Sequence, residues 1–135
     1  MSEALPKIRA EVDAQEVAMQ VATFLDSKRA EEIAVLFVRD LIQVSSYFVI
    51  ATGTSKRVLQ TLADGCQQIL KHAGLPRLGM DGGQEGHWIC IDYGEVVVHL
   101  FDAKTRNFYA LEELWGDAPR VEFERASDPG APADS

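Results

Sequence analysis

Apolar positions recur along the chain with two periods, and the helical period marks three segments. In the first segment Val17, Val21 and Leu25 stand about one helical turn apart, and Asp13 with Glu16 has the form of a capping box. The segments predicted to be helical are residues 13–28, a stretch from a Thr54 or Ser55 cap to Gly74, and a short stretch from Asp102 or Thr105 to Gly116.

The other apolar segments are too short for helices of this kind and are rich in β-branched residues, which predicts strands. Residues 33–40 and 47–53 are continuous apolar runs, typical of buried central strands. Residues 77–83 are predicted to form a shorter strand. Residues 87–101 read as a hairpin that turns at Gly94, because glycine readily adopts the positive φ of a tight turn.

The order of these elements is helix, strand, strand, helix, strand, strand, strand, helix. Such an order predicts an α+β fold with a single five-stranded sheet and helices packed mainly on one face. Strict βαβ alternation is missing, which disfavours a doubly wound nucleotide-binding fold. Residues 13–124 form one predicted domain, residues 1–12 a flexible N-terminus and residues 125–135 a disordered C-terminal tail with nothing to bury.

Length and composition agree with a single globular domain. The chain has 135 residues, of which 47% are hydrophobic and 25% charged, as in ordinary soluble proteins. No apolar run approaches the roughly 20 residues needed to cross a bilayer, and the first residues do not resemble a signal peptide. A cytoplasmic location is therefore expected. Cys66 and Cys90 are far apart, fit regular apolar patterns and lack metal-site spacing, so both are expected to be small buried hydrophobes.

The net charge favours some partners over others. The chain carries 13 basic and 21 acidic residues, a formal charge of −8. Non-specific binding to nucleic acid depends on neutralising phosphates, so a chain this acidic is poorly suited to it. A basic protein partner suits the charge better, because opposite potentials speed encounter. Acidity that serves solubility alone is equally compatible with these numbers.

One loop has the chemistry of a phosphate site. Gly53, Thr54 and Ser55 join a strand to a helix that begins with Lys56 and Arg57, and free amide groups at a helix start can hold phosphate. A nucleotide-binding protein or nucleotidyltransferase using this loop is the alternative function. Such an enzyme needs a pair of carboxylates for its metal ions, and no such pair follows the loop. Ordinary helix capping is the favoured interpretation.

Aromatic residues are concentrated near the C-terminal end. Six of them lie within 28 residues among several acidic ones: Trp88, Tyr93, Phe101, Phe108, Tyr109 and Trp115. One strand and one short helix cannot bury six rings on one side, so an interface with another macromolecule is favoured over a core with a solvated rim. His99 alternates with apolar neighbours and is expected to be a half-buried histidine bonded to a backbone carbonyl, with partner contact as the alternative.

Four stretches of sequence resemble those of one known family. YFVIATGTSKR, the Glu85-Gly86-x-Trp88 step, IDYGEVVVHLFD and RNFYALEELWGDA are similar, in order and spacing, to the ribosomal silencing factor family, also called iojap-related proteins. The resemblance runs from about Glu16 to Ala118. It implies a mixed sheet with helices, in a topology similar to nucleotidyltransferases but without their catalytic carboxylates. Three positions depart from the family pattern: Ser45-Ser46 stands where many members carry Thr-Asp, and Cys90 stands where an aliphatic residue is more common.

The resemblance also implies a function without catalysis, cofactor or metal. Members of the family bind the large ribosomal subunit through its basic protein uL14 and block joining of the small subunit, which represses translation, and they act in large-subunit biogenesis. An exposed patch for such a partner is also compatible with a homodimer of the free protein. The residues expected to contact the partner are Glu85, Trp88, Asp92, Tyr93, Glu95, His99, Phe101, Asp102 and Tyr109.

Overall fold

The computed structural model describes residues 14–39, 45–82, 87–109 and 118–123. Several expectations fall on the other residues and lie outside this description. They are the Asp13 part of the capping box, the flexible N-terminus, the C-terminal tail, the contact by Glu85 and the continuation of the last helix to Gly116. The single-domain boundaries therefore stay a prediction.

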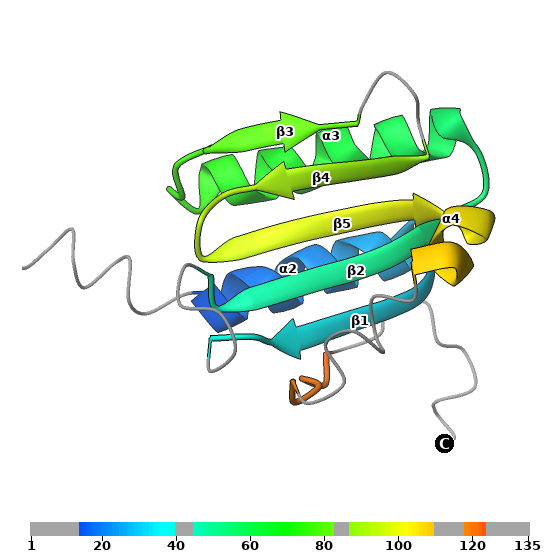
Figure 1. The fold of residues 1–135 in the computed structure, drawn as a ribbon. Coiled ribbons are helices and arrows are strands. Elements are labelled where there is room, and N and C mark those ends of the chain that lie inside the picture. Colours follow the sequence, from blue (N-terminus) through cyan, green and yellow to red (C-terminus); the bar gives the residue numbers. More distant parts are fainter. Residues whose placement is uncertain (1–13, 40–44, 83–86, 110–117, 124–135) are drawn as a thin grey trace, which may run out of the picture.

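The described elements follow the predicted order (Figure 1). The helices are α2 (Ala14–Ser27), α3 (Lys56–His72) and α4 (Ala103–Tyr109), and the strands are β1 (Glu31–Phe37), β2 (Tyr47–Gly53), β3 (Gly79–Asp81), β4 (Trp88–Asp92) and β5 (Val96–Asp102). Ser55 is the cap of α3, since its Oγ accepts the Val58 amide hydrogen at 3.1 Å. Beyond the other end Gly74 has φ +89°, which glycine adopts without strain. None of the described helices is long and apolar enough to cross a membrane.

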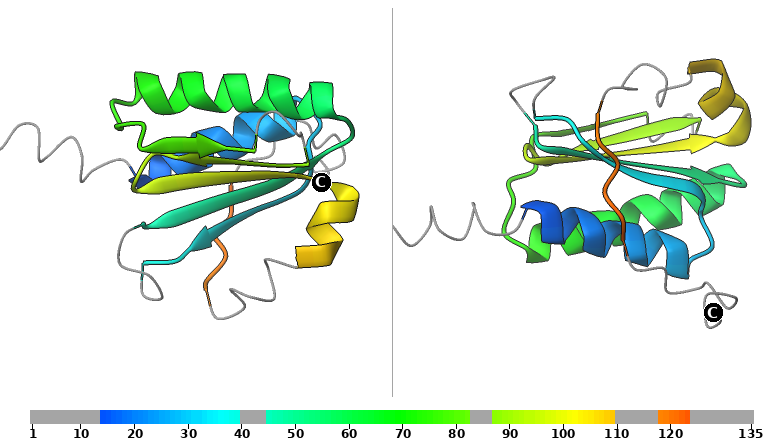
Figure 2. Two further views of the ribbon diagram at one scale, coloured as in Figure 1. Left: turned by 45° about the horizontal axis from the view of Figure 1, so that its top comes forward. Right: turned by 90° about the horizontal axis from the view of Figure 1, so that it is seen from below.

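The five strands form one mixed sheet in the order β1-β2-β5-β4-β3. Strands β2 and β5 run parallel, whereas the other three neighbouring pairs are antiparallel. Helices α2 and α3 lie side by side on one face of the sheet, and α4 lies at the end of β5 (Figure 2). The predicted α+β class, with a mixed five-stranded sheet and helices mainly on one face, is confirmed.

The place of the first strand differs from the prediction. Residues 33–40 were expected to form a central strand, but β1 is at the edge of the sheet and ends at Phe37. It is nevertheless apolar because both of its faces are buried, with Val35 in one apolar cluster and Leu36 in another. Residues 119–121 pair with its outer edge. The Phe37 amide donates to Pro119 O at 2.9 Å, and the Val121 amide donates to Val35 O at 2.8 Å. This pairing covers backbone groups that an edge strand would otherwise expose.

The sheet buries apolar side chains on both faces. Under the helices Ile89, Ile91, Val98 and Leu100 pack against α2 and α3 and belong to the larger cluster. The opposite face carries a smaller cluster that consists of Leu36, Val38, Phe48, Ile50, Val97, Phe101 and Ala118, with Trp88 and Cys90 packed against it. Residues that alternate along β2 and β5 therefore point into different clusters, as strand geometry requires.

The two helices approach each other closely at one glycine. Gly65 lies on α3, and a Cβ atom built on it would stand 2.0 Å from Cζ of Phe24 on α2. That distance is far below van der Waals contact, so the Phe24 ring sits where any larger residue would place its side chain. A glycine inside a helix costs about 1 kcal/mol relative to alanine, and here this packing explains its presence.

We expect Gly65→Ala to destabilise the protein although alanine is the better helix former. The methyl group forces the Phe24 ring out of its place, and such overpacking costs about 1–3 kcal/mol, which outweighs the gain of about 1 kcal/mol in helix propensity. In a Phe24→Ala background the same substitution should raise the free energy of unfolding by about 1 kcal/mol. Urea denaturation of the four proteins measures both effects. Stabilisation by Gly65→Ala with Phe24 intact would contradict this account.

Candidate functional site

The sheet face away from α2 and α3 gathers aromatic rings from three strands. We call Phe48, Trp88, His99 and Phe101 the aromatic face. Strand pairing brings them together, since Trp88 lies opposite Phe101, and Cys90 lies opposite His99. His99 in turn pairs with Ile50 of β2, the next residue on this face after Phe48. Val97, His99 and Phe101 alternate along β5 and therefore share one face of the sheet.

The rings of the aromatic face touch one another. The Trp88 and Phe101 ring centroids are 5.0 Å apart, and Phe48 meets His99 edge to face at 4.9 Å. The Trp88 indole Nε1–H donates to His99 Nδ1 at 3.3 Å. His99 is therefore bonded to an indole, and the expectation of a backbone carbonyl partner was wrong. Aromatic pairs of this geometry stabilise beyond the area they bury.

Exposure separates the aromatic residues that were expected to contact a partner. Trp88 is half-buried, whereas Phe101 is fully buried and His99 is 8% exposed. Tyr93 is 4% exposed and belongs to the cluster under the helices. Direct contact by Phe101 and Tyr93 is thus incompatible with their burial in this conformation, and both act by packing. Trp88 is the ring of the aromatic face that a partner can reach.

Burial also decides the charge of His99. Removal from water penalises the imidazolium, and this lowers the pKa of His99 to about 4, although the negative charge of Asp92 acts in the opposite direction. The imidazole is therefore neutral at pH 7, with its proton on Nε2 because Nδ1 accepts from Trp88. Nε2 is buried and has no hydrogen-bond partner. This unpaired donor destabilises the folded state, a cost that the surrounding packing offsets.

One end of the aromatic face carries a histidine–aspartate pair. His87 Nδ1 lies 2.8 Å from Asp102 Oδ2, and the Thr105 amide donates to Asp102 Oδ1 at 2.8 Å. Asp102 therefore caps α4, one of the two starts predicted for this helix. Partial burial acts to raise the pKa of Asp102, but the hydrogen bonds from His87 and Thr105 lower it overall below its ordinary value. The carboxylate is charged at neutral pH and its side chain is 28% exposed.

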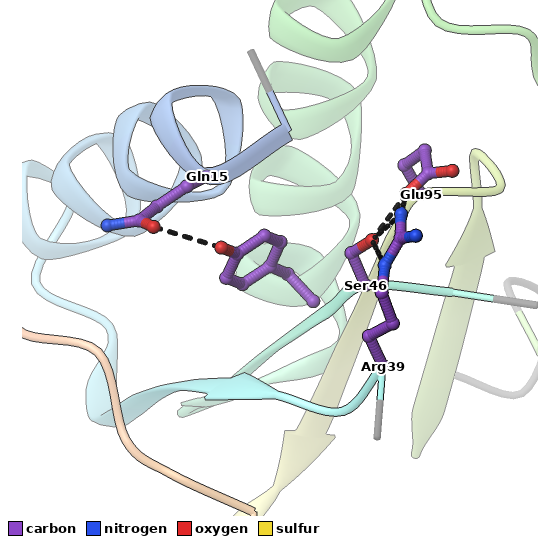
Figure 3. Close-up of polar contacts among 5 residues, drawn as sticks. Gln15, Arg39, Ser46 and Glu95 are labelled. Atoms are coloured by element: carbon purple, nitrogen blue, oxygen red, sulfur yellow. Dashed lines mark hydrogen bonds and ion pairs between the residues drawn. The ribbon is translucent and has the colours of Figure 1, made fainter. Parts of the chain in front are cut away.

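The other end carries the turn between β4 and β5. Asp92 Oδ1 accepts the Gly94 amide at 2.8 Å, and Gly94 has φ +78°, as predicted for a tight turn. The Glu95 carboxylate accepts from Arg39 Nη2 at 2.9 Å and from the Ser46 hydroxyl (Figure 3). Sequence reasoning missed Arg39. Glu95 is 56 positions away along the chain, so no local spacing connects the two residues.

The charge that favoured a basic partner is unevenly distributed along the sequence. The described residues contain ten acidic and ten basic side chains. The other eleven acidic residues, against three basic ones, belong to residues 1–13, 40–44, 83–86, 110–117 and 124–135. Within the described residues the charges balance, so any attraction of a basic group to this part of the chain depends on local carboxylates.

The groups with candidate chemistry have structural roles. The Ser55 hydroxyl caps α3, as the favoured interpretation expected. Cys66 is buried, as predicted, and burial raises its thiol pKa, whereas Cys90 is only half-buried. Burial, with Asp92 and Asp81 nearby, raises the pKa of Cys90 to about 11, so it stays a thiol and is a poor nucleophile. In the described part of the chain no three His, Cys, Asp or Glu side chains are grouped to hold a metal ion.

The structure brings together six of the nine residues predicted to contact a partner. Trp88, His99 and Phe101 share the aromatic face, with Asp92 and Glu95 towards one end and Asp102 at the other. Tyr93 lies on the opposite side of the sheet, as described above. Glu85 and the side chain of Tyr109 lie outside the described structure. A groove of about 960 Å³ between α2 and α3 contains none of the nine.

Comparisons with known proteins agree on one family. The family profile described as "Ribosomal silencing factor during starvation" (RsfS) matches residues 11–135. A ribosomal silencing factor RsfS from Halalkalibacterium halodurans is 34% identical over 110 residues, which cover 82% of this chain and 94% of that protein. A mouse protein named "Mitochondrial assembly of ribosomal large subunit protein 1" is 33% identical over 98 residues, covering 70% of this chain and 43% of the mouse protein.

A solved structure supports the same grouping. A crystal structure of a Chromobacterium violaceum protein superposes with a TM-score of 0.69 at 30% sequence identity. The match covers 85% of this chain and 94% of the other. The fold therefore matches that of a solved protein, and the family profile confirms the resemblance noted from the four sequence stretches.

We expect the buried His99 to make stability depend on pH. Its pKa is about 4 when folded and about 6.5 when unfolded, so between these values the unfolded chain binds the proton more readily and acid favours unfolding. From pH 7 to pH 5 this residue alone should lower the free energy of unfolding by about 2 kcal/mol. Urea denaturation at both pH values should show a smaller drop in His99→Gln. The control His72→Gln, which removes an exposed histidine, should keep the full drop; equal drops in all three proteins would refute the assignment.

Proposed function

This chain belongs to the ribosomal silencing factor (RsfS) family, and from this membership we propose that it binds the large ribosomal subunit through the basic protein uL14 and prevents the small subunit from joining. The match of the family profile to residues 11–135 is the observation that carries the proposal. Repression of translation in the cytoplasm follows from the block. The name of the mouse relative, which refers to assembly of the ribosomal large subunit, supports the choice of subunit and a role in its biogenesis.

The aromatic face and its ends have the properties that such a partner needs. Trp88 offers a half-buried ring, and rings of this kind often supply much of the binding free energy of an interface. Asp92, on the same strand as Trp88, and Asp102, directly after Phe101, are partly exposed carboxylates, which suits the lysine and arginine side chains of a basic ribosomal protein. His99 accepts a hydrogen bond from the Trp88 indole and Phe101 packs against its ring, so both restrict the movement of Trp88.

The proposed mechanism is steric. A factor that covers roughly 800 Å² on its partner, as standard interfaces do, denies that surface to any other molecule. No bond is made or broken, so the affinity for the large subunit decides how completely joining is blocked. The alternative use of Gly53, Thr54 and Ser55 to bind a nucleotide has less support, since the Ser55 hydroxyl already caps α3. A homodimer of the free protein stays a prediction.

The direct test is a subunit-joining assay. Purified protein in excess over separated subunits should co-sediment with the large subunit and reduce the fraction of complete ribosomes formed when small subunits are added. Its effect should saturate at the concentration where binding saturates, because occupancy of the surface is the cause. If small subunits join equally well when this protein occupies every large subunit, the steric mechanism is wrong.

We expect Trp88→Ala to weaken binding to the large subunit at least fivefold, which corresponds to about 1 kcal/mol, because the accessible ring of the aromatic face is lost. Phe24→Ala is the matched control: it removes another half-buried ring, but from the helix side of the sheet, and should leave affinity unchanged. Circular dichroism checks that both variants fold. Tyr93→Ala is not informative here, since its burial predicts unfolding. If Trp88→Ala folds and binds the large subunit with unaltered affinity, Trp88 is not part of the binding surface.

A further inference from the structure

The Glu95 carboxylate, part of the proposed surface, forms an ion pair with Arg39 of the same chain. Arg39 follows β1 and binds two groups at once: its Nε and Nη2 donate to Ser46 Oγ at 2.9 and 2.7 Å, and Nη2 also donates to Glu95 Oε1 at 2.9 Å. The Ser46 hydroxyl donates to the same Glu95 oxygen. In Figure 3 the Arg39 guanidinium, the Ser46 hydroxyl and the Glu95 carboxylate converge on one point.

This side-chain contact is not what holds the turn in place. The Ser46 and Tyr47 amides both donate to Glu95 O, at 3.0 and 2.9 Å, and Asp92 Oδ1 accepts from Gly94 within the turn. These backbone bonds tie the turn to the start of β2 whatever the side chain of Arg39 does. Loss of the guanidinium should therefore leave the turn standing and free the carboxylate.

The contact is also open to competition. The side chains of Arg39 and Glu95 are 56% and 40% exposed, whereas Ser46 is only 2% exposed. An ion pair this exposed contributes at most about a fivefold factor to an equilibrium, so an incoming cation can displace Arg39. Buried Ser46 stays beside Glu95 as a fixed hydrogen-bond donor in either state. While Arg39 is bound, its charge cancels that of Glu95 for an approaching basic partner.

We propose that Arg39 is an internal competitor for Glu95, which a lysine or arginine side chain of the basic partner must displace when this face binds. The inference rests on the proposed function, because it assumes that the turn of Asp92 and Glu95 meets a basic surface. It assigns to Arg39 the role of limiting affinity. A protein that has to leave the large subunit again is thereby kept from binding it too tightly.

Four variants and the unaltered protein test this by titration against large ribosomal subunits and against purified uL14. Arg39→Gln should tighten binding about threefold at 0.1 M salt, with the gain mainly in the association rate and smaller at 0.5 M salt. Glu95→Gln should weaken binding about threefold, and the double variant should match Glu95→Gln, because Arg39 acts only through Glu95. Lys56→Gln is the control: it removes the same charge from an exposed residue near the opposite end of β2 and should change little.

The outcomes separate the two proposals. Equal weakening by Arg39→Gln and Glu95→Gln would mean that the contact positions the turn, and would overturn the inference alone. Weaker binding by Arg39→Gln together with tighter binding by Glu95→Gln would mean that Arg39 itself meets a phosphate or an acidic group, and would also overturn it. No binding by the unaltered protein to either probe would overturn the proposed function, and the inference with it.

Discussion

The parallel pairing of β2 with β5 is the constraint on which the rest of the structure depends. It joins Tyr47–Gly53 to Val96–Asp102 along their whole length, in the middle of the sheet and with apolar side chains on both faces. Because parallel strands start at the same edge, Ser46 and Glu95 meet at one end, while Gly53 and Asp102 meet at the other. Both ends of the candidate surface are thus positioned by one strand pair.

The two faces of the β2–β5 pair differ in what they contact. The helix face buries Val96, Val98 and Leu100 with α2 and α3 and supplies most of the core. The other face holds the aromatic cluster, where one ring, Trp88, stays half accessible and is fixed by its bond to His99. A ring held in this way loses little conformational entropy on binding, which is the property that makes rigid aromatic side chains effective contacts. Fixing Trp88 in this way requires a buried, neutral His99, whose unpaired Nε2–H destabilises the folded state.

Individual carboxylates, and not the net charge of the described residues, determine the electrostatic character of this surface. The described residues carry equal numbers of acidic and basic side chains, so the carboxylates at the turn and at the start of α4 matter through their positions and partners. His87 contacts Asp102 and Arg39 contacts Glu95, while Asp92 accepts from a backbone amide of its own turn. A basic partner therefore meets Glu95 paired with an arginine, Asp102 bonded to a histidine, and Asp92 bonded to a backbone amide. Composition alone describes none of these differences.

The sequence by itself determined the kinds and order of the elements, the buried residues of β2 and β5, the cap at Ser55 and the turn at Gly94, because each depends on periodicity or local backbone preference. The family followed from motifs of fixed spacing. Only the tertiary structure decided that β1 lies at the edge, that Tyr93 and Phe101 are buried, that His99 is bonded to Trp88, and that Arg39 binds Glu95. These features depend on pairing between residues far apart in the chain, and an alternating pattern records which side chains share a face but not what lies across from them.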